Sequence, residues 1–113
     1  MAKKQILIVL SNAVQGREAE YNDWYTNVHL PDVLRVPGLV AAQRYKVGNT
    51  QLKSAPPGKW QYAAVYEMES DDPASVMAEI GRRSRTPDMV VSDAVTDIWA
   101  YLYEPITPRV TAK

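Results

Sequence analysis

Apolar residues recur along the first half of the chain at two different spacings. Residues 5–11, "QILIVLS", form an aliphatic run that is long enough for a strand and too short for a helix. From Arg17 to about Val28, large apolar and aromatic residues return every three or four positions, which predicts an amphipathic helix. Pro31 should end or kink that helix near His29, because proline lacks an amide hydrogen and disfavours helical dihedrals in the preceding residue. A short turn, "PDVLRV", should follow.

The second half of the chain predicts two strands around a loop, then a helix and a last strand. Residues 39–47 and 60–68 have strand patterns, and the polar residues 48–59 between them form a loop rich in turn formers. Asp72 followed by a proline is typical of a helix start, because the carboxylate caps free amides and proline suits the first turn. Residues 97–103 alternate between the two faces and predict the fourth strand.

This order of elements is βαββαβ. With right-handed crossovers it predicts an α+β, ferredoxin-like fold, in which two helices cover one face of a four-stranded antiparallel sheet. At 113 residues the chain fits one domain, with a C-terminal tail from about residue 105. The other face of the sheet would stay bare, and an exposed apolar face of that size is usually packed against a partner. We therefore expect a homodimer in which two sheets pair face to face.

Charge and cysteine content exclude several classes of function. Lys and Arg total 13, as do Asp and Glu, so the net charge is zero and nucleic acid and membrane surfaces are disfavoured as partners. No apolar stretch is long enough for a membrane span or a signal-peptide core, which favours a cytoplasmic location. Cysteine is absent and there is one histidine, so we expect no metal site, since a catalytic zinc needs three protein ligands.

The stretch "YNDWYTNVHLPDVLRVPGLVAAQRY" resembles the EthD-like family of the dimeric α+β barrel superfamily. The resemblance rests on an aromatic pair, a histidine, a proline two positions later and a Pro-Gly turn; the motif residues matched here are Trp24, Tyr25, His29 and Pro31. It implies ferredoxin-like subunits whose sheets pair into a barrel, each with a pocket between helices and sheet. Known members include cofactor-free monooxygenases, lactone isomerases, polyketide cyclases, dehydratases and haem enzymes. The resemblance is specific for the fold and leaves the reaction open.

His29 is the first candidate for catalysis. It lies one turn after Tyr25 and two after Tyr21, so these three side chains should share one side of the helix. An ordinary histidine titrates near neutral pH, which suits it to proton transfer. The alternative is a structural imidazole that bonds a carbonyl freed by the Pro31 break. The family resemblance favours catalysis, with Asp32 orienting the ring and Tyr25 or Tyr21 as hydrogen-bonding partner. The alternative for Asp32 is to supply negative charge at the start of a helical turn.

Aromatic side chains should form the walls of the pocket. The chain has seven tyrosines, three tryptophans and no phenylalanine, and the polar atoms of these rings suit a wet pocket. The expected substrate-binding residues are Tyr21, Trp24, Tyr62, Tyr66 and Trp99. Side chains alternate between the two faces of a strand, so Trp60, Tyr62 and Tyr66 should share one face of the third strand. By the same rule, Trp99, Tyr101 and Tyr103 should share one face of the fourth strand. Ordinary core or dimer packing is the alternative for most of these sheet aromatics.

Gly81 falls on the expected inward stripe of the second helix, with Val76 and Ile80. Glycine inside a helix costs about 1 kcal/mol relative to alanine. Close packing of helix on sheet, or room for a ligand, would account for it.

The function that these observations favour is a cofactor-independent enzyme acting on a small cyclic or aromatic metabolite. The expected chemistry is proton transfer, as in dehydration, cyclisation or isomerisation, with His29 as base or acid. A positioned acid or base contributes about 10²- to 10⁴-fold, which suffices for an activated carbon acid. The alternatives are a cofactor-free monooxygenase, haem binding through His29, and a ligand-binding or accessory protein without turnover.

Overall fold

The computed structural model describes residues 3–113. Its elements are, in chain order, β1 (Lys3–Ala13), α1 (Glu18–Trp24), the π-helical segment η1 (Tyr25–His29), α2 (Leu30–Leu34), β2 (Leu39–Lys46), β3 (Tyr62–Ser70), α3 (Pro73–Arg83) and β4 (Val95–Tyr103). The strands form one antiparallel sheet in the order β2-β3-β1-β4. The predicted ferredoxin-like α+β fold is confirmed.

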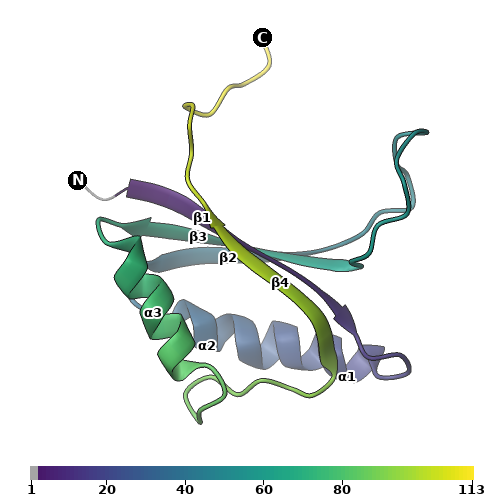
Figure 1. The fold of residues 1–113 in the computed structure, drawn as a ribbon, viewed down its shortest axis with the longest axis horizontal. Helices are drawn as coiled ribbons and strands as arrows, with labels where there is room; N and C mark the ends of the chain where they lie inside the picture. Colours follow the sequence, from purple (N-terminus) through teal and green to yellow (C-terminus); the bar gives the residue numbers. More distant parts are fainter. Residues whose placement is uncertain (1–2) are drawn as a thin grey trace.

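All helices lie on one face of the sheet (Figure 1). Alternate residues of the strands point toward them, and Leu7, Ala64, Tyr66 and Met68 are buried there. They pack against Tyr21, Trp24 and Tyr25 of the first helix, Val76 of α3, and other apolar residues of the core. The β2–β3 loop and the C-terminal tail extend beyond the sheet on the side away from the helices (Figure 1).

The first helix differs from the prediction at its end. The helix does not stop near His29: it continues through Pro31 to the end of α2, with Leu30 in the helical region. Where the break was expected, η1 is a π-helical segment, and the Leu30 amide bonds the carbonyl of Tyr25, five residues back. A wider turn of this kind makes room for the proline ring. It also accommodates the hydrogen bond that proline, which has no amide hydrogen, cannot donate. Pro31 therefore changes the register of the helix instead of ending it.

Two smaller predictions about side chains were also wrong. Gly81 lies in α3 but is exposed, and a Cβ built there would meet no atom within 4 Å, so close packing does not explain it. Trp60 lies before β3 and not on its helix-facing side; its ring lies 6.1 Å from that of Trp99. The predicted helix start is confirmed, because the Asp72 carboxylate accepts a hydrogen bond from the Ser75 amide.

The face of the sheet without helices is apolar along β1 and β4. Ile8 of β1 is paired with Tyr101 and Leu10 with Trp99, so these side chains share the open face. Tyr101 is 56% exposed. No helix within residues 3–113 is long and apolar enough to cross a membrane.

Candidate functional site

A cavity of about 160 Å³ lies between the helices and the sheet, next to β4. Its walls come from the first helix, from the β1, β3 and β4 strands, and from α3 and the segment that follows it. The polar or aromatic side chains on its wall are Ser11, Trp24, Tyr25, His29, Tyr66, Ser84 and Arg85, and the remainder of the lining is aliphatic. The cavity therefore combines an apolar interior with a few polar groups, as ligand sites commonly do.

The π-helical segment sets the direction of the His29 ring. In an α-helix of 3.6 residues per turn, residues five apart lie on different sides. The π-turn instead brings such residues together, and the rings of Trp24 and His29 stack with centroids 4.6 Å apart at 28°. The Tyr25 ring, four residues before His29, meets the imidazole edge-on, with the ring centroids 5.0 Å apart. Tyr25 and His29 thus share one side of the helix, as predicted. Two aromatic neighbours thus fix the imidazole at the cavity wall.

The His29 imidazole has no hydrogen-bond partner on its buried nitrogen. Among the described residues, only Nδ1 of His29 and Oε1 of Gln5 are buried side-chain atoms without one. Burial lowers the pKa of His29 to about 4, against the opposing effect of the Asp32 charge. The ring is therefore neutral at pH 7 and carries one free lone pair. No hydrogen bond joins it to a carbonyl within residues 3–113, so the structural capping role is absent.

Two tyrosine hydroxyls meet beside the histidine. The Tyr66 hydroxyl of β3 donates to the Tyr25 hydroxyl, 3.3 Å away. Burial raises the pKa of Tyr25 to about 12, and it also raises the pKa of Tyr66. Both groups thus stay protonated at neutral pH. Because Tyr25 accepts from Tyr66, its own proton is free to be donated to a bound molecule.

Asp32 does not hold the His29 ring. Its buried carboxylate forms an ion pair with the exposed guanidinium of Arg35, one turn later. The only effect of Asp32 on His29 is electrostatic, because its charge raises the histidine pKa that burial lowers. Asp32 also occupies the first turn of α2, where a negative charge is favourable.

The remaining predicted site residues divide between three places. Trp24 and Tyr66 line the cavity, whereas Tyr21 is buried beneath it, with its hydroxyl 2.6 Å from that of Ser11. Tyr62 is half-buried farther along the sheet, and its hydroxyl accepts a hydrogen bond from Asn22 at 3.3 Å. Trp99 lies on the open face of the sheet, opposite the cavity. The structure therefore does not bring Tyr62 or Trp99 to His29.

Sequence reasoning missed Arg44, which lies beneath the first helix. Its guanidinium stacks 4.6 Å from the centroid of the Tyr25 ring and its charge lowers the pKa of that tyrosine, opposing burial. The signal was available: Arg44 occupies the same face of β2 as Ala42, where alternation predicts an inward side chain. Ser11 on β1 was also missed. The same alternation could have found it, since it is a polar residue at an inward position.

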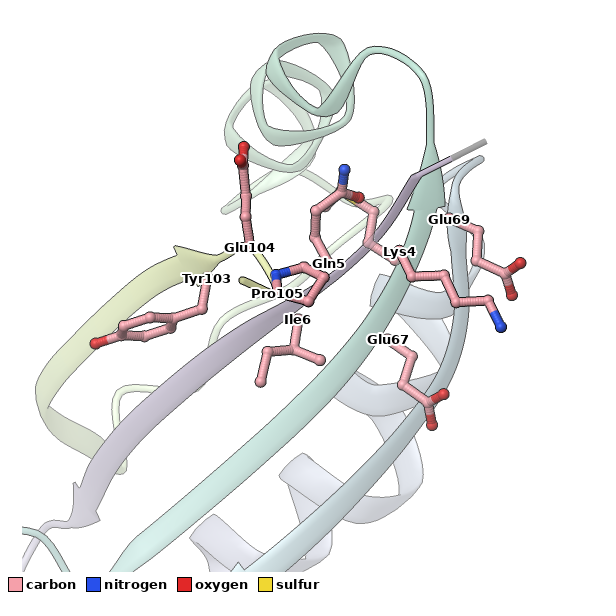
Figure 2. A pocket seen from close by; sticks show the side chains of 9 residues that line it. Lys4, Gln5, Ile6, Glu67, Glu69, Tyr103, Glu104 and Pro105 are labelled. Carbon is pink, nitrogen blue, oxygen red and sulfur yellow. The ribbon is translucent and has the colours of Figure 1, made fainter. Parts of the chain in front are cut away.

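A second, larger hollow of about 320 Å³ lies at the far end of the sheet, where β1, β3 and the tail meet (Figure 2). Its lining includes Lys4 and Ile6 of β1 and Glu67 of β3, with Tyr103 and Pro105 beside them (Figure 2). It has neither a histidine nor a buried hydroxyl pair. The cavity beside His29 is therefore the better candidate for chemistry.

Comparisons with solved structures identify the same arrangement of elements in other proteins. An EthD-like protein from Ralstonia eutropha JMP134 has a TM-score of 0.60 and 17% identity, over 96% of this chain and 97% of that one. A candidate monooxygenase from Shewanella loihica PV-4 has a TM-score of 0.58 and 17% identity, over 95% of this chain and 98% of that one. The chain has the EthD-like fold. The predicted resemblance is thus confirmed for the fold.

A third solved structure with the same arrangement of elements contains a bound porphyrin. A variant of MhuD with two manganese protoporphyrin IX molecules bound per active site has a TM-score of 0.61 and 15% identity, over 95% of this chain and 99% of that one. No protein-family model and no curated protein matches the chain. At these identities the likeness concerns the fold alone.

The cavity beside His29 is too small for a porphyrin. The cavity measures about 160 Å³, below the roughly 300–1,000 Å³ typical of sites for drug-sized ligands. The site instead suits a small molecule, or part of one.

Proposed function

We propose that this protein is an enzyme that takes a proton from a small, largely apolar substrate, with His29 as the base. The observation that carries the proposal is the buried, unpartnered Nδ1 of His29 on the wall of an otherwise apolar cavity. A buried polar atom without a partner is uncommon in folded proteins and is often matched by a ligand or by water. A hydroxyl or an acidic C–H of the substrate would face this ring.

The electrostatics favour a base and disfavour an acid. With a pKa of about 4, His29 is almost entirely neutral at pH 7 and has no proton to donate from a charged form. It is also a weak base, so the proton it takes must be acidic, as in a phenol, an enol or a carbon next to a carbonyl. The Tyr25 hydroxyl, which remains protonated, would donate a hydrogen bond to the oxygen where negative charge develops.

Two reaction classes follow from that first step. Return of the proton to another atom of the substrate gives isomerisation, cyclisation or dehydration without a cofactor. Reaction of the substrate anion with O₂ gives a cofactor-free monooxygenase: a CH₂ group becomes a carbonyl, and the second oxygen atom leaves as water. The Shewanella structure with its candidate monooxygenase activity supports this second class. The two classes share the base and differ in oxygen consumption.

We also propose that the active form is a homodimer joined through the open faces of two sheets. Tyr101 and Tyr103 are more than a third exposed on this face, beside Ile6 and the half-buried Trp99. A continuous apolar face of this kind is unfavourable in water and is typical of an interface. A second copy would cover it with the same residues, as a two-fold axis requires.

Hydrogen–deuterium exchange into candidate substrates tests the proposed base. A panel of phenols and cyclic ketones is incubated with the protein in D₂O, exchange of their acidic C–H groups is followed by proton NMR, and an oxygen electrode records O₂ uptake. The protein should accelerate exchange of at least one member, and His29→Gln should lower that rate by about 10²-fold or more. Glutamine keeps hydrogen-bonding capacity but cannot accept a proton near pH 7.

The matched control is Asn27→Ala, which alters an exposed residue of η1 outside the cavity. It should leave the exchange rate unchanged. Exchange that is equally fast in His29→Gln and in the wild type would contradict His29 as the base, even if the protein still binds the compound.

A further inference from the structure

Arg44 is a half-buried cation without an acidic partner. Its Nη1 donates to Thr26 Oγ1 at 2.8 Å and its Nη2 to Asn22 Oδ1 at 2.9 Å, and both acceptors are neutral. The guanidinium also lies 4.6 Å from the Tyr25 ring centroid and 5.4 Å from that of Tyr21. Within residues 3–113 no carboxylate pairs with it. A charge removed from water in this way is costly unless an opposite charge approaches it.

The other half-buried arginines show what is unusual here. Arg17 pairs with Asp93 at 2.6 Å, and Arg83 pairs with Glu79 at 2.6 Å. Arg44 alone among these three meets only neutral groups. The Arg44 guanidinium is therefore available to an anion from outside the chain.

A hollow of about 250 Å³ adjoins this guanidinium at the β2 edge of the sheet. Its lining residues are Asn22, Arg44, Tyr45, Lys46 and Tyr62, and none of them is acidic. Because Arg44 and Lys46 are two positions apart on β2, both cations lie on the same side of the strand. The hollow shares no lining residue with the His29 cavity.

We propose that this hollow binds the oxyanion group of a small molecule, a carboxylate or a phosphate, through Arg44 and Lys46. The planar guanidinium matches two oxygens of either group, and the lysine adds a point charge. The Tyr62 ring lies on the same side of the sheet and would contact an apolar remainder of the ligand. This site is distinct from the proposed proton-transfer site and does not depend on it.

Titration of the ¹⁵N-labelled protein with two anions tests the proposal. Inorganic phosphate and benzoate are added separately at constant ionic strength, and amide shifts are followed by NMR. Saturable shifts should centre on Asn22, Arg44 and Lys46. Saturation by phosphate alone would assign phosphate as the ligand group, and saturation by benzoate alone would assign carboxylate. Shifts that rise linearly with both anions would overturn the proposal.

Two variants separate binding from stability. Lys46→Gln changes an exposed side chain and should fold normally while binding several-fold more weakly. Arg44→Lys keeps the charge but loses the planar fork, and should weaken binding by about tenfold. Lys53→Gln, in the exposed β2–β3 loop, is the control and should bind as the wild type does. Equal affinity in Lys46→Gln and wild type, or equal loss in the Lys53→Gln control, would refute the site.

Discussion

The two faces of this sheet carry aromatic residues in different states. On the helix-covered face the polar atoms of the rings are paired: Tyr21 with Ser11, Tyr66 with Tyr25, and Trp24 Nε1 with the Val90 carbonyl at 3.0 Å. On the open face, Tyr101 and its neighbours on β4 contact one another and remain partly exposed to solvent.

This difference shows why aromatic content alone does not identify a pocket. Buried tyrosines need partners for their hydroxyls, so a covered face of this composition must contain a hydrogen-bond network. Among residues 3–113 two buried side-chain atoms lack a partner, His29 Nδ1 and Gln5 Oε1, and of these two residues only His29 lines the cavity next to β4. On the open face the apolar area itself is what lacks a partner. This difference is the basis on which we propose ligand chemistry on the covered face and association through the open one.

A charge on the open face should have the largest effect on association. Tyr101→Asp places a carboxylate where two apolar faces would meet, and should weaken a dimer about 100-fold or more because an unpaired charge would be buried. Light scattering coupled to size-exclusion chromatography measures the change in mass. Tyr101→Phe, the matched control, should remain dimeric. A wild-type protein that is monomeric at micromolar concentration would refute the open-face interface.

Gly38→Ala should have the next largest effect, on the stability of the covered face. Gly38 has a φ of +103°, and a Cβ there would come within 2.7 Å of Val76 Cγ2 on α3. The strain and the clash should lower the free energy of unfolding by roughly 1–3 kcal/mol. Urea denaturation measures this loss. Unchanged stability would mean that α3 does not pack on this turn as closely as the structure indicates.

Gly81→Ala should have a smaller effect, of opposite sign. Nothing lies within 4 Å of a Cβ at this exposed position in α3. Alanine should therefore stabilise the protein by about 0.5–1 kcal/mol, through its higher helix propensity. The same denaturation experiment serves as the readout, and a loss of stability would mean that the position is packed.

Local patterns were enough to predict the order of elements but not the details that build the site. The alternation of β4 correctly placed Trp99 and Tyr101 on one face, yet it could not show which face that is. The pairing of β4 with β1 decides it, and a bulge opposite Ser11, with Asp97 at a φ of 55°, shifts the register there. One extra residue reverses which face a side chain occupies, and long-range pairing is not written in a local pattern.

The first helix teaches the same lesson. Pro31 signalled an irregularity near His29, and the structure contains one there. A proline is compatible with a stop, a kink or a π-turn, and the choice depends on how the helix packs on the sheet. Only the π-turn stacks His29 on Trp24. The residues of the motif were therefore predictable, whereas the direction of the imidazole was not.

The stability of the covered face should also depend on pH through His29. Its pKa is about 4 in the folded protein, below the ordinary 6.5, so the unfolded chain binds the proton more readily. The free energy of unfolding should therefore fall as pH falls from about 6.5 to about 4, and should be fully recovered above 6.5. Carboxylates titrate in part of this window, so the comparison is with His29→Gln, which should lack the histidine contribution. Identical profiles would contradict the buried imidazole.

The central claim is that His29 presents a neutral, unpartnered imidazole to the cavity, and its NMR titration tests this most directly. His29 is the only histidine, so its ring signals are assigned without ambiguity. The account predicts that the ring protons keep the shifts of a neutral imidazole from pH 8 down to about pH 5, with a midpoint near 4. A midpoint near 6.5 would mean that the ring is solvated or paired, and would contradict the account.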